Sequence, residues 1–222
     1  MKILLINLGE SRCEYLKDAL TKKYKLKYLD DPYLFLHDED TKYTAEHIID
    51  ATNKIKTQEN LIVKIHAYNI LFSNGKHRYF PIELYNIPMY DKVYITVRDN
   101  LVEHILSIIL SHRKRGKYNL DSILYFNPSI HHTTCMMVLR MIINLQLIEN
   151  FLMLLGKSFT KTYYETIERY VNDELKVKDV EIHKSLPLEN FISNYSDLEK
   201  FVKSLFGTTS YDEFVGKVYG EK

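Results

Sequence analysis

The chain has 222 residues, of which 45% are hydrophobic and 27% are charged, and its 30 basic and 29 acidic side chains give a formal net charge of +1. This near-neutral balance argues against a general nucleic-acid coat, and the small numbers of glycine (7) and proline (5) argue against long disordered linkers. The length fits a single domain over residues 1–222, with a core over 1–170 and a C-terminal helical segment over 171–222.

Membrane insertion and secretion are not expected from the sequence. No uninterrupted apolar run reaches the roughly 18 residues that a membrane span needs, and residues 1–6 resemble a short strand more than a signal peptide. Cys13 and Cys135 form no CxxC motif and cannot build a disulfide framework. His131 and His132 have no cysteine or acidic residues at metal-ligand spacing. A reducing, cytoplasmic setting without a metal is therefore predicted.

Strand and helix patterns alternate along the chain. Apolar runs predict strands over 2–7, 25–29, 61–66, 92–97 and 158–164. Helical periodicity predicts helices from about residue 15 onward and over 43–56, 101–109, 130–155, 196–205 and 211–218. Residues 73–89 are expected to form a loop or a small excursion, and residues 118–128 a loop or a short helix. This order predicts a three-layer α/β/α fold with a mostly parallel central sheet.

The turn between the first strand and the first helix is a candidate anion site. Backbone N–H groups of such a turn and the N-terminus of the helix can hold a phosphate. The segment from Leu8 to Glu14 contains one glycine and lacks the Gly-Lys-Ser/Thr of a Walker sequence. An ordinary strand–helix unit is the alternative interpretation.

Lys64 and His66 end the apolar run that begins at Leu61. Residues two apart on a strand point to the same side, so these two side chains face one site. Open α/β sheets bind ligands at the carboxyl ends of their strands. The alternative is a structural histidine and a lysine whose charged end reaches solvent.

Two further basic features follow the strand over 92–97. Arg98 ends this strand, and Ser107 lies on the helix that comes next. The same helix leads into a basic cluster over 111–117, which is either a clamp for an anion or a solvated C-terminal turn that the helix dipole favours.

In their order, these segments resemble the sulfotransferase family. The run from Gly9 to Leu16 is similar to the family's phosphosulfate loop, in which Ser11, Tyr15 and Leu16 match. Val63-Lys64-Ile65-His66 resembles the family's Lys-Thr-His motif. The segments 97–107 and 162–165 are similar to the arginine–serine segment and to a late strand of the family. The resemblance spans roughly residues 1–170.

The resemblance implies a P-loop-NTPase-like sulfotransferase fold and transfer of a sulfuryl group from 3′-phosphoadenosine 5′-phosphosulfate (PAPS), with PAP as product and no metal. The acceptor would be a hydroxyl or amine of a small molecule or carbohydrate. His66 would be the general base, and Lys64 would stabilise charge on the transferring group. The donor would be held by Ser11, Arg12, Cys13, Glu14, Arg98 and Ser107.

Two alternatives remain open at the level of sequence. Glu10 and Glu14 place negative charge in the donor loop, which favours a non-catalytic nucleotide- or partner-binding protein on the same fold. Another P-loop-like nucleotide-dependent transferase, such as a small kinase, is the second alternative. The segment 68–90 and the C-terminal helices are expected to shape the acceptor pocket. No nucleic-acid or membrane partner is predicted, and the sequence does not indicate an oligomeric state.

Overall fold

A computed structural model describes residues 1–9, 11–32, 44–67, 72–73, 76–77, 86–114, 128–181 and 195–220. The chain divides into two compact units. The first, here called the sheet unit, comprises residues 1–97 and 141–181. The second, the helical unit, comprises residues 98–140 and 182–222.

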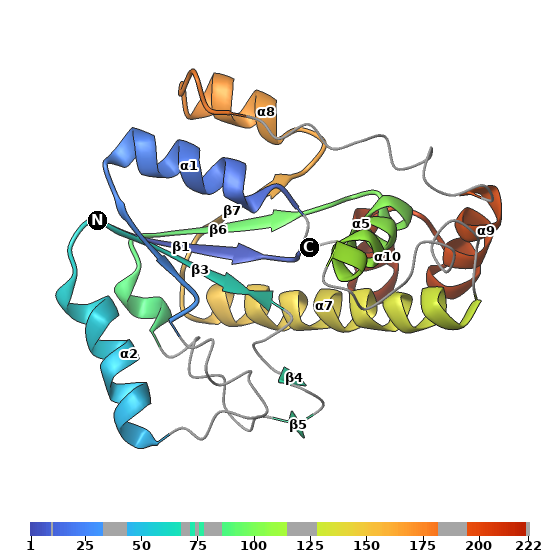
Figure 1. Cartoon of the computed structure of the whole chain (residues 1–222), viewed down its shortest axis with the longest axis horizontal. Coiled ribbons are helices and arrows are strands. Elements are labelled where there is room, and N and C mark those ends of the chain that lie inside the picture. The colour runs from blue at the N-terminus through green and yellow to red at the C-terminus, as the bar shows by residue number, and fades with distance from the viewer. Residues whose placement is uncertain are drawn as a thin grey trace. The chain divides into compact units, whose positions relative to one another are not determined.

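A five-stranded parallel sheet forms the centre of the sheet unit (Figure 1). Its order is β2-β3-β1-β6-β7, so β1 is the central strand. The strands are β1 (Lys2–Asn7), β2 (Lys27–Asp30), β3 (Leu61–His66), β6 (Lys92–Val97) and β7 (Phe159–Tyr163). Two short strands, β4 (Phe72–Ser73) and β5 (Lys76–His77), form a separate antiparallel pair.

Continuous apolar runs explain why β1, β3 and β6 are the inner strands. Ile3, Leu4, Leu5 and Ile6 of β1 are fully buried, as expected for a strand covered on both faces. In contrast, β2 is an edge strand whose four residues are exposed or half-buried, and its weaker apolar pattern agrees with that position.

Helices cover both faces of this sheet, so the predicted three-layer α/β/α fold is confirmed. In Figure 1, α1 (Cys13–Tyr24) and α8 (Ile167–Arg169) lie over one face, and residues 141–154 of α7 (Pro128–Leu154) lie over the other. The unit also contains α2 (Ala45–Thr57), η2 (Ile87–Met89) and η3 (Tyr170–Glu174). Thr44 is the N-cap of α2 and forms a capping box with His47.

The helix α7 bears on the expectation that the chain has no membrane span. Over Ser129–Leu154 it is long and apolar enough to cross a membrane by length and composition, although no uninterrupted apolar run predicted this. Half of its most apolar window is nevertheless buried within the protein, and Asn144, Gln146 and Glu149 are buried polar residues on it. A mostly buried core helix meets the same criterion, so this helix is only weak evidence for a membrane-spanning segment.

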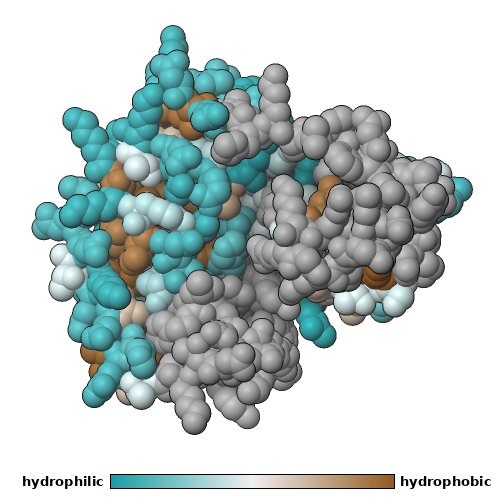
Figure 2. All heavy atoms as spheres, in the orientation of Figure 1, coloured by the Kyte–Doolittle hydropathy of each residue, from teal (hydrophilic) through white to brown (hydrophobic). Residues whose placement is uncertain are grey.

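Elsewhere on the protein, Figure 2 shows hydrophilic side chains over most of the described part of the visible face, with smaller apolar patches among them. Single apolar side chains at the surface are normal in globular proteins.

The helical unit is held together by its C-terminal segment. It contains α5 (Leu101–Lys114), residues 128–140 of α7, α9 (Tyr195–Phe206) and α10 (Tyr211–Tyr219). The Asp99 carboxylate accepts hydrogen bonds from the Ser210 hydroxyl at 2.9 Å and from the Asp212 N–H at 3.1 Å. Phe206 and Phe214 meet edge to face, with ring centroids 5.3 Å apart. The turn after β6 is thereby tied to the start of α10.

Most predicted elements lie within two residues of their predicted bounds, and the strand over 61–66 is confirmed at both ends. The second strand begins two residues later than predicted, at Lys27. The helix that begins at Leu101 extends to Lys114 rather than to 109. Glu10, most of the segment 68–90, residues 115–127 and the side chains of 112–114 lie outside the described residues.

Candidate functional site

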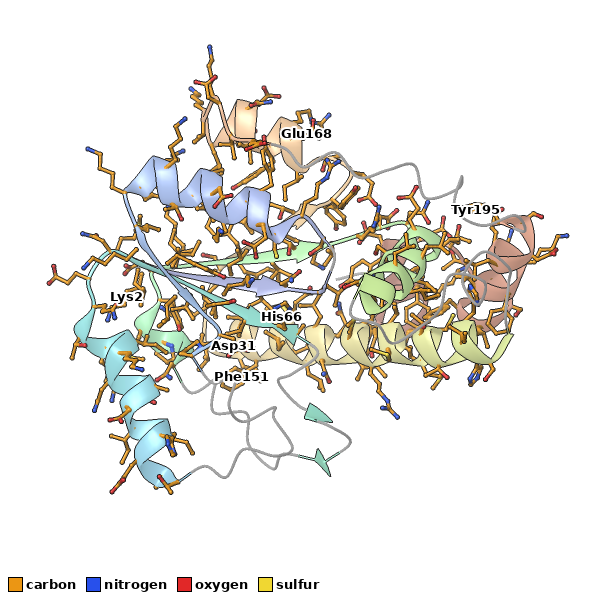
Figure 3. The ribbon with its side chains drawn as sticks, in the orientation of Figure 1. Lys2, Asp31, His66, Phe151, Glu168 and Tyr195 are labelled. Atoms are coloured by element: carbon orange, nitrogen blue, oxygen red, sulfur yellow. The ribbon has the colours of Figure 1, made fainter. Side chains whose placement is uncertain are left out.

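A row of polar side chains crosses the sheet at the carboxyl ends of its strands. The register places His66 of β3 beside Asn7 of β1, Asn7 beside Thr96 of β6, and Thr96 beside Thr162 of β7. Neighbouring residues in register on parallel strands point to the same face, so the four form one polar row. Figure 3 shows His66 at the tip of β3.

Asn7 is the centre of a hydrogen-bond network in this row. Its Oδ1 accepts from the Gly9 N–H at 2.9 Å and from the Ser11 hydroxyl at 2.6 Å. Its Nδ2 lies 3.3 Å from His66 Nδ1. Ser11 Oγ also lies 2.7 Å from Thr96 Oγ1. Asn7, Ser11 and Thr96 are almost completely buried, so the network holds the loop after β1 against the ends of β3 and β6.

The loop after β1 leads into a helix whose first turn has no side-chain cap in the described structure. Gly9 and Arg12 have positive φ angles of 85° and 56°, and Arg12 is the N-cap of α1. No side-chain hydrogen bond caps this end among the described residues. The first backbone N–H groups of a helix have no partner within the helix and carry the positive end of its dipole. An anion could be held here.

Lys64 is a buried cation within a cluster of acidic partners. Its Nζ lies 2.5 Å from Glu14 Oε1 and 3.2 Å from Asp30 Oδ1, while Glu14 Oε2 also pairs with Lys17 Nζ at 2.7 Å. Burial alone lowers the pKa of the Lys64 ammonium, but hydrogen bonds with Glu14 and Tyr28 outweigh it and raise the pKa above its usual value. Lys64 is therefore charged and already neutralised by protein carboxylates.

Arg12 is held by two other residues, one of which is acidic. Its Nη1 lies 2.6 Å from Glu168 Oε1, and its guanidinium lies 4.2 Å from the centre of the Tyr164 ring. Its Nε is buried without a hydrogen-bond partner among the described residues. Figure 3 shows Glu168 on the α8 ribbon, over the α1 face of the sheet. The neighbouring Cys13 is buried in the first turn of α1.

Arg98 and Ser107 belong to the helical unit and are described within it. Arg98 is 2% exposed, and its Nη2 pairs with Glu103 Oε2 at 2.8 Å. The Ser107 hydroxyl donates to the backbone oxygen of His104 at 2.8 Å. The Arg98 guanidinium, which the family resemblance assigns to the donor, therefore has a carboxylate partner inside its own unit.

The structure brings together six of the eight residues that the sequence singled out. Ser11, Arg12, Cys13 and Glu14 form the loop and first turn of α1, and Lys64 with His66 end β3 on the same face. Sequence reasoning missed Asn7 and Thr96. Both are polar residues within or at the end of apolar strands, and strand alternation places them on the face of His66 once the register is known.

The described residues hold no group of three or more histidine, cysteine or acidic side chains that could bind a metal. One surface hollow in the sheet unit lies away from the polar row. It is lined by Lys22 and Lys23 at the C-terminal end of α1 and by the segment 175–179.

Comparisons with known proteins give a limited result. No protein-family model and no curated protein matches the chain. Among solved structures, the chain is similar to the YorR protein from Bacillus subtilis, whose crystal structure is a complex with phosphorylated GDP. The two are 16% identical with a TM-score of 0.48, and the match covers 84% of this chain and 100% of YorR. A similarity of this size assigns neither a ligand nor a reaction to the chain.

Proposed function

We propose that the carboxyl edge of the sheet unit binds a phosphate group of a nucleotide. The observation that carries this proposal is the N-terminus of α1, which no described side chain caps and which follows a loop anchored by Asn7 at the end of the central strand. A 12-residue helix that begins there directs its first N–H groups and its dipole at this edge.

The topology of the sheet also supports ligand binding at this edge. The chain leaves β1 toward β2 on one side of the sheet, and it leaves β3 toward β6 on the other side. The strand order therefore reverses between β1 and β3, which is where open α/β sheets bind their ligands. Asn7 and His66 are the last residues of these two strands.

Charge at this edge determines how a phosphate would bind. Arg12, Lys17 and Lys64 lie in or beside the loop and first turns of α1, and each pairs with a protein carboxylate. A bound phosphate would take hydrogen bonds from the backbone of α1 and would compete with those carboxylates for the cations. Glu168 is the competitor for Arg12.

Binding can be tested by calorimetry and thermal shift with PAP, ADP and GDP. We expect at least one of them to raise the melting temperature. Replacing Glu168 by Gln should tighten its binding about threefold to tenfold, since a charge-assisted contact of Arg12 with phosphate contributes on the order of 1 kcal/mol at a partly exposed site. Glu59→Gln removes the same charge from an exposed position beside the start of β3 and should leave affinity unchanged.

The proposal fails if none of the three nucleotides binds at millimolar concentration. It also fails if Glu168→Gln and Glu59→Gln change affinity equally, because the effect would then come from net charge alone.

Sulfuryl transfer from PAPS is a second candidate function. The observation that favours it is the placement of Lys64 and His66 on the same face of β3, beside the loop that contains Ser11. In that reaction His66 would remove the proton from the acceptor. Transfer of labelled sulfate from PAPS to a panel of phenols, amines and sugars tests it. Nucleotide binding without any transfer would leave the binding function as the better proposal.

A further inference from the structure

The orientation of the Asn7 amide follows from its partners. A backbone N–H can only donate, so the Asn7 atom 2.9 Å from the Gly9 nitrogen must be the oxygen. The Ser11 hydroxyl donates to the same oxygen at 2.6 Å. With its own proton used in this way, Ser11 Oγ accepts from the Thr96 hydroxyl at 2.7 Å. The hydrogen bonds of this buried network therefore have one direction: Thr96 donates to Ser11, and Ser11 donates to Asn7.

The same orientation determines the protonation of His66. If Oδ1 of Asn7 faces Gly9, its NH₂ group faces His66 Nδ1, at 3.3 Å. An amide NH₂ only donates, so Nδ1 must accept and cannot carry a proton. A neutral imidazole holds one proton, which is then on Nε2. Protonation of Nδ1 would direct its N–H at the NH₂ group of Asn7, so that two hydrogen-bond donors would face each other.

From this geometry we infer that Asn7 is a positioning residue that holds His66 as the Nε2–H tautomer, so that His66 meets its ligand as a hydrogen-bond donor rather than as a base. The ligand part of this inference rests on the proposed function. Phosphate and sulfate oxygens accept hydrogen bonds, so an imidazole N–H suits such an anion. A general base needs a lone pair directed at the acceptor's proton, and in this tautomer the lone pair of His66 is directed at Asn7.

The tautomer can be measured without any ligand, by long-range ¹H–¹⁵N NMR on protein labelled at histidine nitrogen. The loss of one spin system in His66→Gln assigns the signals, and the pH is set where that imidazole is neutral. We expect the Nε2–H pattern in the wild-type protein. Asn7→Asp should move the proton to Nδ1, since a carboxylate oxygen can still accept from Gly9 and Ser11 while the other accepts from Nδ1–H.

Thr162→Val is the matched control for Asn7→Asp. It alters a buried residue of the same polar row three strands away from His66, and we expect it to leave the tautomer as it is in the wild type. A wild-type Nδ1–H pattern overturns the inference, as does a folded Asn7→Asp protein that retains Nε2–H. If the Asn7→Asp protein does not fold, the wild-type spectrum alone determines whether His66 is the Nε2–H tautomer.

Binding of a nucleotide tests the donor role separately. The amide NH₂ of glutamine can replace an Nε2–H, whereas alanine cannot. We therefore expect His66→Gln to keep the affinity within about threefold and His66→Ala to lose about tenfold, which is about 1.4 kcal/mol. Equal losses in the two variants overturn the donor role. An Nε2–H wild type that binds no nucleotide supports the tautomer and refutes the proposed function, so the two failures are distinguishable.

Discussion

At the scale of single residues, Glu14 has a different role from the one that its sequence position suggests. As a carboxylate in a donor loop, it would repel an anionic ligand. In the structure it forms ion pairs with the buried Lys64 and with Lys17. A buried ammonium without a partner is costly, so Glu14 contributes to stability as well as to the charge of the edge.

The stability that Glu14 contributes should depend on pH. Burial on its own raises the pKa of the Glu14 carboxyl, but hydrogen bonds from Lys17 and Lys64 outweigh it and leave the pKa below its usual 4.5. A group whose pKa is lower in the folded state stabilises the protein above its unfolded pKa, and this contribution is lost as the pH falls through the folded pKa. Glu14→Gln should therefore lower the free energy of unfolding near pH 7 by about 1 kcal/mol, because the pair is partly exposed and Asp30 remains beside Lys64.

Urea denaturation at neutral pH and at several values below pH 4.5 checks this prediction. The difference between the wild type and Glu14→Gln should shrink as the pH falls, and Glu59→Gln should show almost no difference at any pH. A Glu14→Gln difference that stays constant with pH would mean that the loss comes from packing and not from the charge.

The residues of the site were visible in the sequence, but their pairing was not. Lys64 and Glu14 are 50 positions apart, and Arg12 and Glu168 are 156 apart. Alternation along a strand gives the side to which a residue points, whereas the partner depends on which helix crosses that side and in which register. The network of Asn7 was missed for the same reason, since it needs the register of β1 against β3 and β6.

At the scale of elements, strands with continuous apolar runs were predictable and the exposed edge strand was less so. Inner strands must be apolar on both faces, which leaves a strong pattern in the sequence. The edge strand β2 has no such requirement, and its start was misplaced. The general apolar character of α7 concealed buried polar residues, one of which, Asn144, donates to the Ala67 backbone oxygen at 3.1 Å.

A buried ion pair joins α7 to β7. Lys161 Nζ lies 2.8 Å from Glu149 Oε1, with the Glu149 side chain 3% exposed and that of Lys161 21% exposed. Lys161→Ala leaves a buried carboxylate without its cation and should destabilise the protein by about 3 kcal/mol. Glu149→Gln should cost less, about 1 kcal/mol, because the partly exposed ammonium can reach solvent.

Urea denaturation of the two single variants and of the double variant tests this asymmetry. Combining Lys161→Ala with Glu149→Gln should recover part of the stability that Lys161→Ala loses, since the buried charge is then absent. A double variant whose loss is the sum of the two single losses would show that the charges do not interact.

At the scale of the whole molecule, the chain leaves the sheet unit after Val97 and returns at Met141, so residues 98–140 of the helical unit are inserted between β6 and β7, while residues 182–222 of that unit follow the sheet unit. The sequence did not indicate this division, because α7 runs through the boundary as one continuous helix. No composition change or glycine- and proline-rich linker marks the boundary at 140–141.

The centre of the sheet should be the most slowly exchanging part of the molecule. The central strand β1 is bonded to β3 on one side and to β6 on the other, and its apolar side chains are fully buried. Amides in such strands exchange only when a large part of the fold opens, whereas exposed edges exchange through local fluctuations. Native-state hydrogen exchange in low denaturant should therefore find the slowest amides in β1, β3 and β6. Backbone amides of β2 that do not face β3 should exchange faster than the amides of these three strands. A slowest group in α9 or α10 would contradict this, and would place the most stable core in the helical unit.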